Sequence, residues 1–155
     1  MIRRRPIRVR AFALLIPLLA MGCARNAPSS ASSTETPPQW MLGVFEDDYG
    51  SRHAITPASW THDAYATYHV VRWDADGQYL IARNDAGNAA DGGRWTRIDW
   101  MRLEGMPPYA WAFCLSTWNA ATEQEAVSAA VADRATPRTG CGGHPFTRMK
   151  RADME

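Results

Sequence analysis

The sequence lacks the patterns by which common enzymes and metal proteins are identified. Its four histidines show no paired spacing that would hold a metal ion, and no serine or cysteine lies in a motif for nucleophilic catalysis. The longest apolar run, residues 11–20, is too short to cross a bilayer as a stable helix. We therefore expect no catalytic residues, no bound metal and no cofactor, and interpret the histidines as structural or surface residues.

Positive charge is scarce outside the N-terminus. Five of the 17 basic residues lie within residues 1–22, which contain no acidic residue, and this leaves 12 basic residues against 16 acidic ones in the rest of the chain. A mildly acidic domain presents no basic surface for nucleic acid. Nucleic acid is therefore not an expected partner.

The N-terminus has the pattern of an export signal. A basic segment, residues 1–10, precedes the apolar run of residues 11–20, which fits a secretory signal peptide. The following Leu19-Ala20-Met21-Gly22-Cys23 resembles the lipobox of bacterial lipoproteins. The resemblance implies cleavage after Gly22, lipidation of Cys23 and often a further acyl chain, such as palmitate, on the new N-terminus. An ordinary signal peptide cut nearby and an uncleaved anchor are the alternatives.

The same resemblance implies a location. Two or three acyl chains hold a protein firmly on a membrane, whereas one chain binds reversibly. Residue 24 is alanine, not aspartate, which in Gram-negative lipoproteins favours transport to the outer membrane. We expect a cell-envelope protein bound to outer-membrane lipid through Cys23. Residues 24–39, rich in Ser, Thr, Pro and Ala, are expected to be a disordered linker.

Strand patterns and turn sequences alternate over residues 40–149. The clearest hairpin joins residues 65–73 to residues 78–83 through Asp74-Ala75-Asp76-Gly77. Six or seven strands at this spacing indicate an antiparallel meander that is closed or partly closed into a barrel. The order of elements resembles the lipocalin-like barrels. Further strands are expected at 40–46, 52–56, 94–103, 109–118 and 144–149, and residues 150–155 are expected to form a disordered tail.

Large and small side chains alternate in residues 109–118. Trp111 and Phe113 share one face, and Ala112 and Cys114 share the other. This predicts a strand whose large face fills the core and whose small face lies beneath a covering element. The fold class is therefore mainly β with one helix (α+β).

The covering element is expected to be a late helix. Thr122 and Glu125 have capping-box spacing, and the helix is expected to run to about Arg134. With Cys23 assigned to lipid, Cys114 and Cys141 remain as a pair, which in an exported chain predicts a disulfide.

The aromatic residues give the candidate binding site. All seven tryptophans lie between Trp40 and Trp118. Most are expected in the core, but a subset lining a barrel mouth would bind an apolar or flat ligand. Arg97 and Asp99 form either a buried network or an ion pair closing one barrel end. The candidate ligand-binding residues are Trp60, Tyr68, Trp73, Tyr79, Trp95, Trp100, Arg97 and Asp99.

Two polar clusters have competing interpretations. The residues Asp47, Asp48, Tyr49, Arg52 and His53 form either a binding rim or, as we expect, a solvated hairpin turn. The loop of residues 84–93 is oxygen-rich, but an ordinary polar loop is favoured over a calcium site.

The sequence thus predicts a membrane-anchored lipoprotein whose β domain binds a hydrophobic or cell-envelope ligand or a protein partner. A structural or assembly accessory of the outer membrane without a ligand is the alternative, and a barrel-scaffold enzyme is less favoured.

Overall fold

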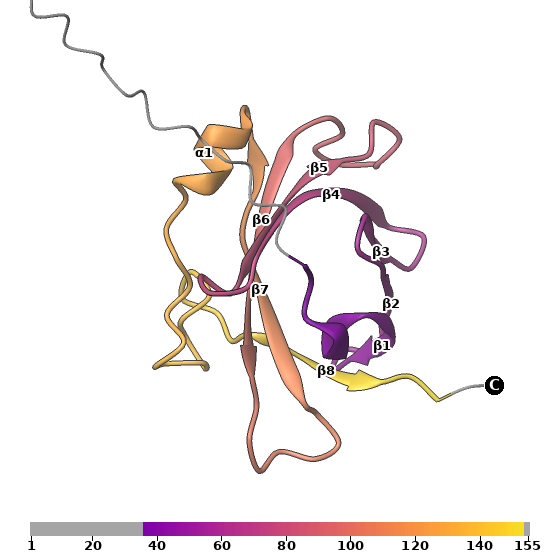
Figure 1. Ribbon diagram of the computed structural model, residues 1–155, viewed down its shortest axis with the longest axis vertical. Coiled ribbons are helices and arrows are strands. Elements are labelled where there is room, and N and C mark those ends of the chain that lie inside the picture. Colours follow the sequence, from indigo (N-terminus) through magenta and orange to yellow (C-terminus); the bar gives the residue numbers. More distant parts are fainter. Residues whose placement is uncertain (1–35, 154–155) are drawn as a thin grey trace, which may run out of the picture. The chain divides into compact units, whose positions relative to one another are not determined.

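The structure, a computed structural model, describes residues 36–153 (Figure 1). The expected signal peptide, Cys23 and most of the expected linker lie outside the described residues. Pro37, within the expected linker, is already buried. In the described part of the chain, no helix has the length and apolar character needed to cross a membrane.

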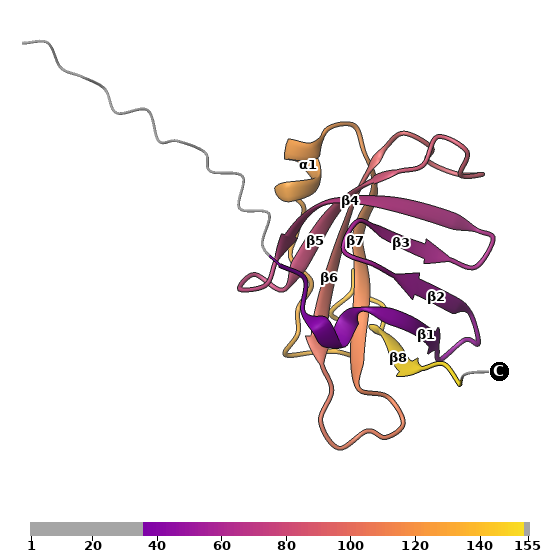
Figure 2. The same cartoon turned by 45° about the vertical axis from the view of Figure 1, so that its right-hand side comes forward.

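Residues 36–153 form a closed barrel of eight antiparallel strands in chain order (Figure 2). Each strand pairs with the next, and the final strand pairs back with the first, with Arg151 opposite Phe45. The predicted β meander and closed barrel are therefore confirmed. The strands are β1 Gly43–Asp47, β2 Arg52–Ile55, β3 Ser59–His62, β4 Ala66–Asp74, β5 Tyr79–Asn84, β6 Trp95–Arg102, β7 Trp111–Ala120 and β8 Thr147–Arg151.

Aromatic side chains fill the middle of the barrel. Trp60, Trp73, Trp100 and Trp111 are at most 2% exposed. Their rings meet in edge-on and tilted contacts, such as Trp60 on Trp111 at 5.9 Å between centroids. Aromatic pairs prefer such geometries, and each ring buries a large apolar area. The barrel interior is therefore a packed core over most of its length.

One end of the barrel, here called the closed end, is where β1, β3, β5 and β7 begin. A short 3-10 turn, η1 Gln39–Met41, places Met41 in the core and Trp40 against Trp111. The expected strand at 40–46 was wrong for its first residues. Gly43 has a φ of +120°, and a Cβ there would collide with the Arg151 side chain. The chain therefore turns at Gly43, and strand pairing starts only there.

The outer face of β7 lies beneath residues 121–146, as the alternation predicts. Ala112 and Cys114 are buried there, and the predicted disulfide joins Cys114 to Cys141. Thr122 is confirmed as the N-cap, since its hydroxyl accepts from the Glu125 N–H at 3.1 Å. The Glu125 carboxylate reaches back as expected, but it accepts from the N–H of Ala121 at 2.9 Å.

The helix is shorter than expected. α1 spans Glu123–Val127 and does not reach Arg134. The Val127 carbonyl accepts a hydrogen bond from the Arg97 guanidinium instead of continuing the helix. Arg134 in turn donates to the backbone oxygens of Trp100 and Gln78. Tertiary hydrogen bonds therefore override the local helix signal.

Two further expectations are corrected at β3 and β8. Residues 59–62, which are not among the strands expected from the sequence, form β3, and this raises the number of strands to eight. Lys150 and Arg151, expected in a disordered tail, belong to β8, where Lys150 pairs with Glu46 at 2.9 Å. Pairing with β1 orders these two residues.

Candidate functional site

A pocket of about 300 Å³ lies at the opposite end of the barrel, here called the open end, where β1, β3, β5 and β7 finish. Its apolar lining residues include Trp60, Ile98, Phe113 and Leu115. Its polar wall is formed by Asp47, Ser51, His53, His62, Tyr68, Tyr49 and Thr147. The aromatic core thus ends in a concave, partly polar mouth.

The change from core to pocket follows the two-residue period of the strands. On β1, Phe45 precedes Asp47; on β3, Trp60 precedes His62; on β2, which runs the other way, His53 precedes Ile55. Residues two apart share a face of a strand. Three neighbouring strands therefore each present one apolar and one polar inward side chain, and the polar members gather at the open end.

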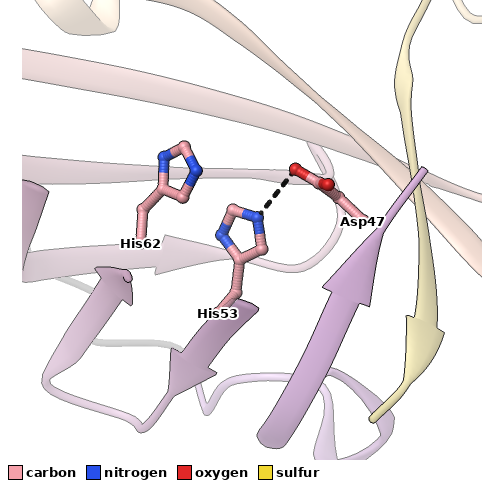
Figure 3. A group of neighbouring side chains, drawn as sticks. All are labelled: Asp47, His53 and His62. Atoms are coloured by element: carbon pink, nitrogen blue, oxygen red, sulfur yellow. Dashed lines mark hydrogen bonds and ion pairs between the residues drawn. The ribbon is translucent and has the colours of Figure 1, made fainter. Parts of the chain in front are cut away.

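Both ring nitrogens of His53 are engaged. The indole Nε1–H of Trp60 donates to Nδ1 at 3.0 Å. An indole N–H can only donate, so Nδ1 carries no proton and the proton of the neutral ring is on Nε2. Nε2–H then donates to Oδ2 of Asp47 at 3.1 Å (Figure 3). His53 is held as one neutral tautomer.

The electrostatics of the pair agree with that tautomer. Burial lowers the pKa of His53, because desolvation disfavours the imidazolium. Burial alone raises the pKa of Asp47, but hydrogen bonds from His53, Ser51 and Tyr49 outweigh it and hold the pKa below 3.8. At neutral pH the pair therefore carries one negative charge, on a carboxylate that is 4% exposed.

His62 stacks on His53 across the β2–β3 pairing. The two rings lie 4.3 Å apart at an angle of 18°, and their residues are directly opposite in register. Among the described residues, none forms a hydrogen bond with the buried Nε2 of His62. Buried polar atoms normally have a partner, so this nitrogen is a candidate acceptor for a ligand of the pocket.

Asp47, His53 and His62 are also arranged like a metal site, with ligating atoms all within 4.8 Å of one another. A histidine that binds a metal through one nitrogen donates its other N–H to an acceptor. His53 instead faces the donor Trp60. The cluster therefore offers two side-chain ligands, whereas a structural zinc site has four, and the geometry argues against a metal centre.

The structure separates the eight residues predicted to bind a ligand. Trp60 and Tyr68 line the pocket. Trp73 and Trp100 are 5.7 Å apart in the buried core towards the closed end. The other four lie on the outer face of β5 and β6, towards residues 121–146: Tyr79, Trp95, Arg97 and Asp99.

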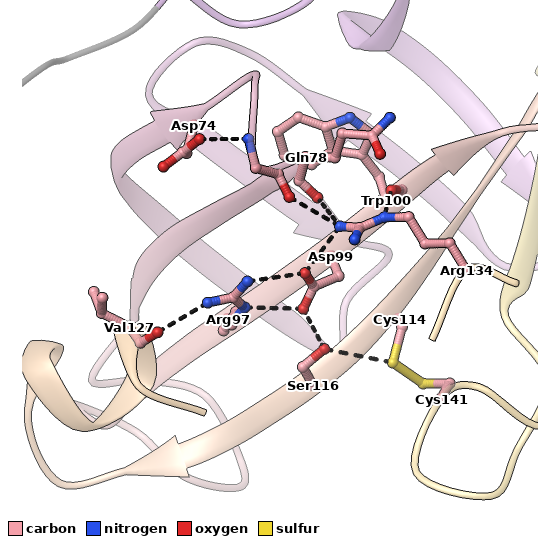
Figure 4. A network of polar contacts seen from close by, with 11 residues as sticks. Asp74, Gln78, Arg97, Asp99, Trp100, Cys114, Ser116, Val127, Arg134 and Cys141 are labelled. Atoms are coloured by element: carbon pink, nitrogen blue, oxygen red, sulfur yellow. Dashed lines mark hydrogen bonds and ion pairs between the residues drawn. A yellow bond between two sulfur atoms is a disulfide. The ribbon is translucent and has the colours of Figure 1, made fainter. Parts of the chain in front are cut away.

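Arg97 and Asp99 belong to a buried network beneath the covering segment (Figure 4). Arg97 donates to both carboxylate oxygens of Asp99, at 2.9 and 3.1 Å. Arg134 donates to one of them at 3.1 Å, and the Ser116 hydroxyl to the other. The network joins β6, β7 and the segment of residues 121–146, so the buried alternative holds and these charges do not close a barrel end.

The expected solvated turn was wrong for Asp47 and His53, which are 4% and 1% exposed. Strand closure carries both side chains into the pocket, whereas Asp48 lies outside the pocket, is partly buried and pairs with Arg148 at 2.8 Å. Sequence analysis missed His62 as their neighbour. The only indication in the sequence is the two-residue alternation, which places Asp47, His53 and His62 on the inward face of their strands.

The oxygen-rich loop after β5 is occupied by its own hydrogen bonds. Asn84 donates to the backbone oxygens of Asp91 and Trp118 and accepts from Thr96. Asn88 exchanges hydrogen bonds with the backbone of Thr67. These side chains shape the rim and do not converge on a cation.

Comparison with known proteins gives no relative from which a role can be transferred, since no family model, curated protein or solved structure matches the chain. The function is therefore argued from the pocket.

Proposed function

We propose that the chain is a lipid-anchored envelope protein whose barrel binds a small ligand in the open-end pocket. The observation that carries this proposal is the buried, unpartnered Nε2 of His62 beside the buried carboxylate of Asp47. A concave site with an apolar floor and a few convergent polar groups is the usual form of a small-molecule site. The eight-stranded meander with one late helix supports a lipocalin-like comparison, in which a barrel of this size holds one small ligand.

The ligand we propose is compact. Trp60 and Phe113 fill the barrel below the pocket, with their rings 5.0 Å apart. A long acyl chain has no room to enter between them. The proposed ligand combines an apolar part that rests on these rings with a polar group that meets Asp47 and His62.

The anchor is a proposal from the lipobox-like residues 19–23. Native mass spectrometry of the protein purified from its own envelope tests the lipid anchor and the bound ligand in one experiment. We expect a mature mass that starts at Cys23 with added acyl chains, and a second, ligand-bound species. A Cys23→Ser variant is the control for acylation. An unmodified Cys23 would overturn the anchor, whichever result is obtained for the ligand.

Leu115→Trp tests the pocket directly. A larger side chain at this lining position fills the site, and we expect the ligand-bound species to disappear while the fold is retained. Val71→Trp is the matched control, because Val71 is exposed on β4. Equal ligand retention in the two variants would place the ligand elsewhere and overturn the proposed function.

A protein partner is the second candidate. A groove of about 550 Å³ on the outside of the barrel is lined by Leu103, Met106, Pro137, Pro145 and Phe146, among others. Such apolar depressions mark protein contacts more often than bare surface does. A partner that is lost in Met106→Asp, but kept in Leu115→Trp, would favour a structural or assembly role.

A further inference from the structure

We infer that the pocket takes a small organic ammonium ligand, with its N–H groups between Asp47 and His62 and its apolar part against Trp60 and Phe113. This inference rests on the proposed function and adds the chemical class of the ligand.

Within residues 36–153, the buried carboxylate of Asp47 has no lysine or arginine partner. Oδ1 of Asp47 accepts from the N–H groups of Tyr49 and Ser51 at 2.9 and 2.8 Å, and Oδ2 accepts from His53. All three donors are neutral. Among the described residues, the only ion-pair neighbour of Asp47 is His53. Buried charges are normally paired, so the pocket lacks a positive charge.

The contrast with the other buried carboxylate is direct. Asp99 is fully buried and meets two guanidinium groups, those of Arg97 and Arg134. Asp47 has no such partner in residues 36–153, although it lines a cavity. A cationic ligand would neutralise the Asp47 carboxylate in the way that the two arginines neutralise Asp99.

Asp47 and His62 place acceptor atoms close together at the pocket. A carboxylate has about four lone-pair positions, and three at Asp47 are used within the chain. Nε2 of His62 accepts when the ring proton is on Nδ1. The ligating atoms of Asp47 and His62 lie within 4.8 Å of each other (Figure 3). One ammonium group, which has three donors, spans both acceptors.

The wall of the pocket has the composition that suits an organic cation. Trp60, Phe113 and Tyr68 supply aromatic surfaces, and the described lining residues include no lysine or arginine. Aromatic faces stabilise organic cations, and Asp47 repels anions. A metal ion would use the same acceptors, but the Trp60–His53 hydrogen bond removes its third ligand.

The test compares matched probes on the purified full-length mature protein in detergent. The probes are 2-phenylethylamine, which is cationic, 2-phenylethanol, which is neutral, 3-phenylpropanoate, which is anionic, and Zn²⁺. NMR signals of the Trp60 indole and the His62 ring report binding. We expect the amine to bind roughly tenfold more tightly than the alcohol, as for a charge-assisted hydrogen bond, and the carboxylate to bind least.

Two variants connect this preference to the residues. His62→Phe keeps a ring stacked on His53 but removes Nε2, and Asp47→Asn removes the charge. In Asp47→Asn we expect the preference for amine over alcohol to fall to near unity. In His62→Phe we expect both probes to bind more weakly, because Nε2 accepts a hydrogen bond from either one. Asp48→Asn is the control, because Asp48 pairs with Arg148 and does not line the pocket. If Asp47→Asn does not fold, His62→Phe still tests the site, and amine binding unchanged from the parent protein would overturn the inference.

The outcomes are distinct. If the alcohol or the carboxylate perturbs the pocket as strongly as the amine, or if none of the three organic probes perturbs it, the ammonium inference is wrong. If Zn²⁺ shifts His53 and His62 and the amine does not compete, the site is a metal site and the inference is again wrong. The proposed function fails separately, when Leu115→Trp leaves the natural ligand bound.

Discussion

The indole of Trp60 sets the protonation of His53. Its Nε1–H donates to Nδ1 at 3.0 Å, so His53 cannot take up a second proton while this hydrogen bond is in place. The tautomer that results points Nε2–H at Asp47 and leaves that carboxylate charged. A core aromatic residue thus fixes the charge of the pocket above it.

Trp60→Phe tests this relationship. An aromatic ring is kept at this position but the N–H donor is lost. Nδ1 can then accept a proton, and we expect the pKa of His53 to rise relative to the parent protein. Loss of the hydrogen bond also costs stability, about 1 kcal/mol. NMR titration of the imidazole signals measures the pKa. Trp73→Phe is the control, because the Trp73 indole donates to the Pro57 oxygen instead. An unchanged His53 pKa in Trp60→Phe would contradict the prediction.

Stability should fall on acidification in two stages. The pKa of His53 lies below 6.5 in the folded state, so between that lower value and about 6.5 the unfolded chain binds more protons and stability falls with falling pH. The pKa of Asp47 lies below 3.8 in the folded state, so the stability that its carboxylate contributes is lost as the pH falls below that value. The slope from one proton is at most about 1.4 kcal/mol per pH unit.

Urea unfolding between pH 4 and pH 8 measures the first stage. We expect a plateau at the upper end and a decline that begins near the ordinary imidazole pKa of 6.5. His53→Gln should lack most of this decline. The same decline in the variant would assign it to another group.

Asp99→Asn should be strongly destabilising. It leaves Arg97, which is buried, without its carboxylate, and removing one member of a buried ion pair costs roughly 3–5 kcal/mol. Arg138→Gln is the control, because Arg138 is exposed and outside this network. Denaturant midpoints measure both. A loss below about 1 kcal/mol in Asp99→Asn would mean that the network adds little stability.

The disulfide should stabilise the domain by about 3–4 kcal/mol. It joins cysteines 27 residues apart, and the loop-entropy relation gives this magnitude. Unfolding of the Cys114→Ser/Cys141→Ser double variant measures it. Amide exchange should increase in residues 128–146 and stay unchanged at Trp60, because the bridge holds the covering segment and not the pocket. Faster exchange throughout the barrel would contradict this local role.

The sequence was most informative where a single strand decides the outcome. The alternation at Trp111, Ala112, Phe113 and Cys114 predicted both faces of β7, because strand period alone sets them. It was least informative where contacts between residues far apart in the sequence determine the local structure. Thr122 starts a helix as predicted, but the helix ends early because Arg97, on another strand, bonds Val127.

The pocket illustrates the same limit. Asp47 and His53 flank a polar turn sequence that is typical of a solvent-exposed hairpin. They are buried because the barrel closes around them. Trp60 and Tyr68 were predicted to bind a ligand, but the sequence did not separate them from Trp73 and Trp100. Which end of the barrel each tryptophan occupies follows from strand register, and register is set by pairing across the whole sheet.

β8 has a consequence for how the domain is made. Thr147–Arg151 supplies the pairing that joins β7 to β1, and Arg148 bonds Asp48, 100 residues earlier. Until residue 151 has left the ribosome, β1 and β7 have open edges that pair readily with other chains. The barrel therefore cannot close until its last strand has been synthesised. A chain that ends before Thr147 is expected to aggregate.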